Sequence, residues 1–202
     1  MNILFAASEA VPYSASGGLG EVAGSLPKAI AERGHNCAVV IPMYKSISDE
    51  MRIHMEFVAN ITVDVSWRKQ YCGIFKAKKN GIVYYFIDNE EYFGGWTPYG
   101  DLKRDCEKFA FFSRAALSVL PVIGFKPDIV HCHDWQTGLI PVYLHDSFEQ
   151  GEFYRGIKSV MTIHNLKFQG VWDVKTFKYI SGKSGSFIIE IVKSCSFART
   201  CT

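Results

Sequence analysis

The side chains best suited to chemistry lie in two short polar segments in the second half of the chain. Asp134 and His164 offer one carboxylate and one imidazole, a pair that can hydrogen-bond sugar hydroxyls or carry a proton. His131 and His133 also allow a metal site with Asp134, because alternate residues of a strand point to one side and His164 could complete the ligand set. Hydrogen-bonded histidines at strand ends are commoner than metal ligands, so the Asp134–His164 pair is the favoured interpretation.

Two other kinds of catalysis are disfavoured. Cys132 lies in an apolar strand segment, where a thiolate nucleophile is poorly stabilised. No second carboxylate is paired with Asp134 as in a glycosidase, so acid–base hydrolysis is not favoured. Flat aromatic surfaces that suit sugar rings are offered by Trp96, Tyr99 and Trp135, and the alternative for the tryptophans is plain core packing.

A glycine-rich segment near the N-terminus is a candidate anion site. The chain reads as a buried strand at 3–7, a loop that ends in Gly17, Gly18 and Gly20, and a helix from Glu21. Glycines let backbone N–H groups approach a phosphate, and a helix N-terminus adds partial positive charge. Neither the dinucleotide fingerprint nor the P-loop sequence is met. A turn that only packs the helix against the strand is the alternative.

The elements that must position these groups follow an α/β pattern. Four apolar runs predict parallel strands at 3–7, 37–42, 127–132 and 159–163. Amphipathic segments predict helices at 21–33, 106–120 and 139–146. Ligands of open α/β sheets bind beyond the carboxyl ends of the strands, so the glycine loop and the two polar segments are expected to converge at one edge.

The middle of the chain interrupts this alternation. Residues 57–65 alternate between apolar and polar, and two further strands at 71–77 and 82–87 flank Asn80-Gly81, a strong hairpin signal. A long loop at 88–105 follows. The sequence therefore predicts a Rossmann-like parallel sheet with helices on both faces and an antiparallel hairpin insertion.

Composition limits the class of protein. The 202 residues suffice for one domain, or for one domain and an incomplete second. A net charge of +2 indicates neither nucleic acid nor a membrane surface as partner. Neither a transmembrane helix nor a signal peptide is expected, because no apolar run is long enough and no basic segment precedes the first one. The six cysteines lack paired spacing, so reduced thiols and a cytoplasmic protein are expected.

Several motifs together resemble the N-terminal half of bacterial glycogen synthase and plant starch synthase. They follow that family's order and spacing, and they comprise Ser8-Glu9 with Pro12 and the segments 17–27, 109–115, 131–138 and 162–170. The resemblance covers residues 1–179, which we expect to form the acceptor-side domain. Residues 180–202 do not continue the pattern and are expected to be a divergent or truncated tail.

The resemblance implies a retaining glucosyltransferase with a glycosyltransferase-B fold, in which two Rossmann-like domains face each other. Such enzymes transfer glucose from ADP-glucose to the non-reducing end of an α-1,4-glucan and use no metal or other cofactor. This chain would lack the C-terminal nucleotide-binding domain, would be inactive alone, and would self-associate through its exposed cleft wall. One alternative is a non-catalytic glucan-binding or regulatory fragment, and another is a nucleotide-dependent oxidoreductase. The oxidoreductase is disfavoured because no acidic residue follows the second strand.

The same resemblance assigns roles to individual residues. His164 and Asp134 are the expected catalytic pair: His164 contacts the transferred glucose, and Asp134 binds sugar hydroxyls near the reaction centre. Gly17 and Gly18 would lie against the donor diphosphate, and Glu21 belongs to the same substrate-binding segment.

The remaining substrate-binding positions implied by the resemblance line the sugar side of the site, and they are Glu9, Tyr99, Trp135 and Asn165. Ala15 stands where the family's commonest form carries a lysine. A lysine there would pair with phosphate charge, so the neutralisation of the diphosphate and the preferred nucleotide are open.

Overall fold

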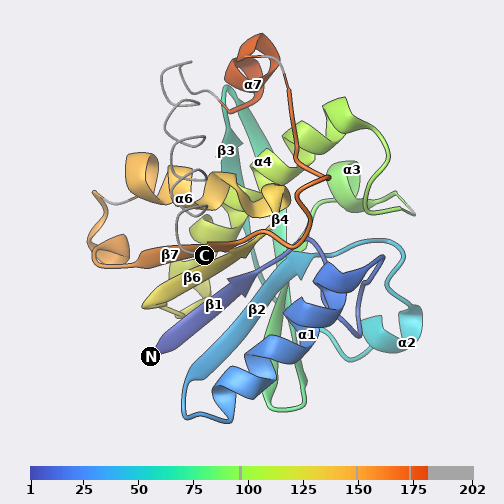
Figure 1. The fold of residues 1–202 in the computed structure, drawn as a ribbon, viewed down its shortest axis with the longest axis vertical. Coiled ribbons are helices and arrows are strands. Elements are labelled where there is room, and N and C mark those ends of the chain that lie inside the picture. The colour runs from blue at the N-terminus through green and yellow to red at the C-terminus, as the bar shows by residue number, and fades with distance from the viewer. Residues whose placement is uncertain (96, 149, 173, 182–202) are drawn as a thin grey trace.

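A seven-stranded mixed sheet organises the computed structural model, which describes residues 1–95, 97–148, 150–172 and 174–181 (Figure 1). The strands are β1 (Asn2–Ala6), β2 (Asn36–Pro42), β3 (Glu56–Val65), β4 (Arg68–Lys79), β5 (Ile82–Asp88), β6 (Ile129–His133) and β7 (Lys158–Thr162). Their order across the sheet is β3-β4-β5-β2-β1-β6-β7. The neighbours from β5 to β7 pair in parallel, whereas β4 is antiparallel to both β3 and β5.

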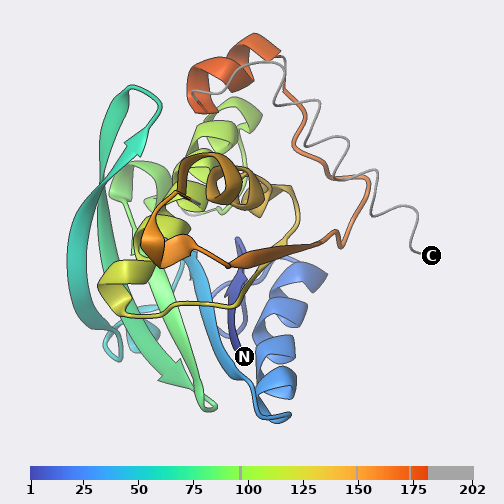
Figure 2. The same ribbon diagram turned by 90° about the vertical axis from the view of Figure 1, so that its left-hand side faces the viewer.

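Helices lie on both faces of the sheet, with α1 on one face and α4 on the other (Figures 1 and 2). The α-helices are α1 (Gly18–Ala31), α2 (Asp49–Arg52), α3 (Glu90–Phe93), α4 (Leu102–Ser118), α5 (Leu120–Ile123), α6 (Leu139–Tyr143) and α7 (Val174–Ser181). Shorter helical turns are η1 (Trp135–Thr137), η2 (Leu144–Phe148) and η3 (Glu152–Tyr154). The predicted fold class is confirmed.

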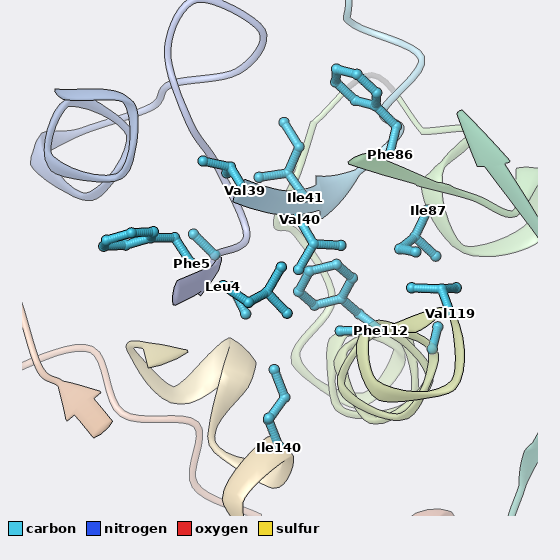
Figure 3. Packing of buried hydrophobic residues seen from close by; sticks show 14 of the residues in the cluster. Leu4, Phe5, Val39, Val40, Ile41, Phe86, Ile87, Phe112, Val119 and Ile140 are labelled. Carbon is cyan, nitrogen blue, oxygen red and sulfur yellow. The ribbon is translucent and has the colours of Figure 1, made fainter. Parts of the chain in front are cut away.

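The side chains of β1 and β2 alternate between two core layers, as Figure 3 shows. Leu4 and Val40 point toward Phe112 of α4, while Phe5 and Val39 point to the opposite face. All five side chains are buried. Strands buried on both faces need apolar residues at consecutive positions, which is why they read as unbroken apolar runs in the sequence.

The predicted hairpin is present, and its outer strand extends the sheet. Asn80 and Gly81 have φ values of 50° and 84°, the left-handed pair that a tight two-residue turn requires. β5 then pairs with β2 in parallel, so the hairpin joins the main sheet through β5. The antiparallel insertion is therefore an extension of one edge of the sheet.

Two helices begin earlier than the sequence patterns predict. α1 begins at Gly18 rather than Glu21, and Gly20 N already donates to Gly17 O at 3.2 Å. α4 begins at Leu102, and α3 occupies part of the expected loop at 88–105. Asn89 caps α3 by accepting a hydrogen bond from Tyr92 N at 3.1 Å.

In the described part of the chain, no helix is both long and apolar enough to cross a bilayer. The four described cysteines, Cys37, Cys72, Cys106 and Cys132, are buried and form no disulfide. Burial raises the pKa of the Cys132 thiol, which agrees with the expectation that Cys132 is not a nucleophile. Cys195 and Cys201 lie outside the described residues.

Candidate active site

The candidate site lies at the carboxyl ends of three adjacent parallel strands, β1, β6 and β7. Glu9 follows β1, Asp134 follows β6 and His164 follows β7. The last two loops are bonded together, because Asp134 N donates to Thr162 O at 2.9 Å and His164 N donates to Asp134 Oδ1 at 2.7 Å. Tyr99 reaches these loops from the segment before α4. Burial raises the pKa of its hydroxyl, and the negative charge of Glu9 raises it further, with a smaller effect from Asp134. The expected convergence of loops is confirmed.

Three imidazoles lie close together, and two of them lie beside Phe5. His131 and His133 project from the same side of β6 with ring centroids 4.2 Å apart, and the Phe5 ring lies 5.3 and 6.1 Å from them respectively. His133 Nδ1 lies 2.8 Å from His164 Nε2, and His131 Nε2 lies 2.7 Å from Thr162 Oγ1. Side chains therefore tie the end of β6 to the end of β7.

This arrangement gives no support to a metal site. Among the residues that the structure describes, no group of three or more His, Cys, Asp or Glu side chains is arranged to hold a metal ion. His133 and His164 direct ring nitrogens at each other, and His131 directs one at a hydroxyl. A ring nitrogen that is engaged in such a bond does not offer its lone pair to a cation.

His133 is the most strongly perturbed titratable group of the cluster. Its side chain is fully buried, and burial is the main cause that lowers its pKa from 6.5 to about 3, with smaller effects from His131 and His164. Burial also lowers the pKa of His131. His133 is therefore neutral throughout the physiological range.

The His133 pKa predicts a pH-dependent stability. Below pH 6.5 the His133 side chain binds a proton in the unfolded chain, whereas in the folded chain it does so only near pH 3. The contribution of His133 to the free energy of unfolding is therefore complete above pH 6.5 and is lost as the pH falls toward 3. Its slope approaches about 1.4 kcal/mol per pH unit. Urea unfolding between pH 6 and 4 should show a shallower loss of stability in His133→Phe than in the wild type. Equal slopes would contradict the assignment.

Asp134 has a backbone conformation that non-glycine residues rarely adopt. Its φ is 57° and its ψ is −179°, a region that costs about 1–3 kcal/mol for a residue with a side chain. The strain is held by hydrogen bonds on both sides, since Thr137 N donates to Asp134 O at 3.1 Å and the carboxylate binds His164 N. Strain of this kind is typical of functional sites.

Substitutions at Asp134 should separate strain from hydrogen bonding. Asp134→Ala keeps the strain and loses the bond to His164 N, so we expect the free energy of unfolding to fall by about 2–3 kcal/mol. Asp134→Gly loses the same bond but relieves the strain, so the loss should be about 1 kcal/mol or less. Urea denaturation followed by circular dichroism measures both. A glycine variant that is as unstable as the alanine variant would show that the conformation is not strained.

The glycines of the N-terminal loop serve two different purposes. A Cβ at Gly20 would lie 2.7 Å from Ala15 Cβ, and one at Gly24 would lie 2.3 Å from Val11 Cγ2, so both allow the loop to pack on α1. A Cβ at Gly17 or Gly18 would meet nothing within 4 Å. Close packing therefore explains why positions 20 and 24 are glycine. It does not explain Gly17 and Gly18, which face open space at the N-terminus of a 14-residue helix.

Glu9 is buried and acts as the hub of a hydrogen-bond network. Its carboxylate accepts bonds from Ser16 N, from Ser16 Oγ at 2.9 Å and from the Tyr99 hydroxyl. Because Tyr99 donates to Glu9, Ser8 Oγ must donate to Tyr99, at 2.8 Å. Glu9 thus fixes the residue before Gly17 against the segment that carries Tyr99.

The segment that carries Tyr99 is held by two residues that the sequence patterns did not identify. Lys108 Nζ lies 2.5 Å from Asp105 Oδ1 and donates to Pro98 O at 2.5 Å, while Gly100 N donates to Asp105 Oδ2 at 3.1 Å. Both side chains are buried. In the sequence, Asp105 and Lys108 are opposite charges three residues apart on a predicted helix, a spacing that usually indicates an exposed ion pair.

Trp135 lies between two aromatic rings. Its centroid is 5.2 Å from that of Phe109 and 5.1 Å from that of Trp172. A Cβ at Gly170 would lie 2.5 Å from the Trp135 ring, so the loop after β7 passes directly against it. Trp135 is half-buried, and core packing accounts for much of its surface.

The other candidate residues lie on the surface. Ala15 and Glu21 are exposed, the latter in the first turn of α1. Asn165 is exposed, and its Oδ1 accepts a hydrogen bond from Lys167 N at 2.9 Å. Trp96 lies outside the described residues.

Comparisons with known proteins identify the relatives of this chain. Residues 2–194 match the family model described as "Starch synthase catalytic domain". The glycogen synthase of Lachnospira eligens is 59% identical over 181 residues, which cover 90% of this chain and 38% of the relative. The glycogen synthase of Lachnoclostridium phytofermentans is 54% identical over 182 residues, with the same coverage of 90% and 38%.

A solved structure shares the fold. The catalytic domain of starch synthase IV from Arabidopsis thaliana, bound to ADP and acarbose, superposes with a TM-score of 0.80 and 27% sequence identity, covering 91% of this chain and 37% of that chain. The present chain thus spans a little over a third of the length of these relatives. From its motifs, its sheet and the match over residues 2–194, the chain belongs to the starch synthase catalytic domain family, as the N-terminal half of a glycosyltransferase-B fold.

Proposed function

We propose that this chain supplies the acceptor-side half of a glycogen synthase, which transfers glucose from ADP-glucose to the non-reducing end of an α-1,4-glucan with retention. The observation that carries the proposal is the open glycine pair, Gly17 and Gly18, at the N-terminus of α1. The Ser16–Glu9–Tyr99 network links this pair to the strand ends. The relatives named glycogen synthase and the ADP- and acarbose-bound structure support the same assignment.

The proposed roles follow from what a diphosphate leaving group requires. Transfer needs hydrogen-bond donors at the developing negative charge, and backbone N–H groups at Gly17 and Gly18 would supply them. His164 and Asp134 would act at the transferred glucose. The remaining proposed substrate contacts are Glu9, Ala15, Glu21, Tyr99, Trp135 and Asn165.

We further propose that the reaction uses no metal or organic cofactor and takes place in the cytoplasm. The leaving group would be stabilised by fixed dipoles of the protein, which need no reorganisation during the reaction. Because Ala15 places no cation beside the glycines, we infer that charge neutralisation comes from the half that this chain does not contain.

Complementation tests the proposal. Transfer of labelled glucose from ADP-glucose to glycogen is measured for the 202-residue chain alone, and for the chain mixed with the remaining C-terminal part of the Lachnospira eligens glycogen synthase. We expect transfer only in the mixture. Robust transfer by the chain alone would refute the requirement for the second half, and no transfer in a mixture that forms a stable complex would refute the proposed function.

We also propose that the isolated 202-residue chain self-associates through β7. This strand forms one edge of the described sheet, and its Val160 side chain is 46% exposed. Ile163 and Phe168, in the loop that follows, are 39% and 66% exposed. An edge strand offers unpaired main-chain groups, and a second copy can pair with it antiparallel about a two-fold axis.

Sedimentation velocity tests this association. The wild-type chain should sediment as a concentration-dependent mixture of monomer and dimer, and Val160→Lys should shift it to monomer because a charge then faces its own copy across the strand pair. Ile53→Lys is the matched control, since Ile53 is 76% exposed and lies beyond α2, away from the edge. Monomer at every concentration would contradict the proposal.

A further inference from the structure

His133 has no role in the proposed chemistry, yet it is the buried neighbour of His164. It is fully buried on β6, with the Phe5 ring stacked 6.1 Å away and His131 4.2 Å away. Its Nδ1 lies 2.8 Å from His164 Nε2, and the two rings are nearly parallel, at 12°. Its other nitrogen, Nε2, is buried and has no hydrogen-bond partner among the described residues.

Two proton arrangements are open to this pair when each ring carries a single proton. If His164 Nε2 carries the proton and donates, His133 must be protonated at Nε2, which leaves a buried N–H without a partner. If His133 Nδ1 carries the proton and donates, the unpartnered atom is a bare acceptor nitrogen. A buried donor without a partner is the rarer and costlier of the two, so the second arrangement is favoured.

We propose that His133 is a positioning residue that holds the His164 imidazole in the tautomer protonated at Nδ1, by donating from its own Nδ1 to His164 Nε2. Burial lowers the pKa of His133 to about 3, so His133 carries a single ring proton at neutral pH. The tautomer itself is independent of the proposed function, and only its use in glucosyl transfer rests on that function.

Two consecutive residues then fix His164 from two directions. Asp134 Oδ1 accepts from His164 N at 2.7 Å and fixes the backbone, while His133 fixes the ring. With Nε2 occupied as an acceptor, His164 keeps a single N–H, at Nδ1, and can act toward a ligand only as a donor through its ring. A donor suits a sugar hydroxyl or a phosphate oxygen, and the wrong tautomer would present a lone pair instead.

The tautomer can be read directly by long-range ¹H–¹⁵N correlation on the ¹⁵N-histidine-labelled 202-residue chain at neutral pH, with His164→Gln used to assign the His164 signals. We expect the Nδ1-protonated pattern at His164 in the wild type. His133→Asn should retain it, because the Asn amide nitrogen lies near the position of imidazole Nδ1. His133→Phe should lose it, since it keeps a flat ring but has no donor.

Every outcome bears on the proposal. An Nε2-protonated His164 in the wild type would overturn it, as would an unchanged Nδ1 pattern in a folded His133→Phe. If the phenylalanine variant does not fold, His133→Gln replaces it, because the longer amide carries its nitrogen away from the Nδ1 position. None of these measurements uses glucosyl transfer, so a failed complementation assay would leave this result standing.

Discussion

Replacing Glu9 with alanine is expected to lower the free energy of unfolding by about 2–3 kcal/mol. Glu9 is buried and accepts hydrogen bonds from Ser16 N, Ser16 Oγ and the Tyr99 hydroxyl. Removing the buried carboxylate leaves the Tyr99 hydroxyl and two donors of the exposed Ser16 without their acceptor, and a buried donor left unpaired costs about 1–3 kcal/mol. Urea denaturation of both proteins at neutral pH measures the difference.

Tyr99→Phe gives the matched comparison. It removes the bond from Tyr99 to Glu9 and the acceptor of Ser8 Oγ, while Glu9 keeps its bonds to Ser16, so the expected loss is about 1–2 kcal/mol. The loss of free energy of unfolding in the Glu9→Ala, Tyr99→Phe double variant should be about 1–2 kcal/mol smaller than the sum of the two single losses, because both changes remove the same hydrogen bond. Strictly additive effects would show that Glu9 and Tyr99 do not act as one network.

Replacing Gly24 with alanine is expected to cost about 3 kcal/mol, although alanine favours helices by about 1 kcal/mol over glycine. The added Cβ would lie 2.3 Å from Val11 Cγ2 and 2.6 Å from Val11 O. A flexible side chain could move aside, but the carbonyl belongs to a backbone that is fixed by the bond from Val11 N to Gly20 O at 3.0 Å. Steric overlap therefore outweighs the gain in helix propensity.

Gly17→Ala is the control, and it should change stability by no more than about 0.5 kcal/mol. A Cβ there meets nothing within 4 Å, and its φ of −174° is extended backbone that any residue adopts. In the complemented transfer assay, however, Gly17→Ala should lower the rate at least tenfold, because the methyl group would occupy the space proposed for the diphosphate. A Gly17→Ala variant that is both stable and fully active would show that the diphosphate of ADP-glucose does not bind at Gly17.

The main features of the fold were predictable from local patterns. The unbroken apolar run at 37–42 predicts a strand buried on both faces, and β2 has that environment. Asn80-Gly81 predicts a tight hairpin, and both residues adopt left-handed φ values. The convergence of Asp134 and His164 at one edge follows from parallel strands, whose carboxyl ends meet on the same side of the sheet.

Local patterns failed where distant packing decided the outcome. The glycines before Glu21 read as a loop, but the absence of a Cβ at Gly20 lets Ala15 approach, and the helix begins at Gly18. Asp105 and Lys108 read as an ordinary helical charge pair, and only their burial against the 98–100 segment gives them a role in holding Tyr99.

The sequence by itself determined the sheet, the hairpin, the family and the identity of the residues at the strand ends, because periodicity and turn chemistry are properties of neighbouring residues. The tertiary structure alone decided how those residues are used. Glu9 bonds Tyr99 across 90 residues, and His133 bonds His164 across 31. Such contacts depend on which side chains the fold buries together, since a polar group out of reach of water must find its partner wherever the chain brings one.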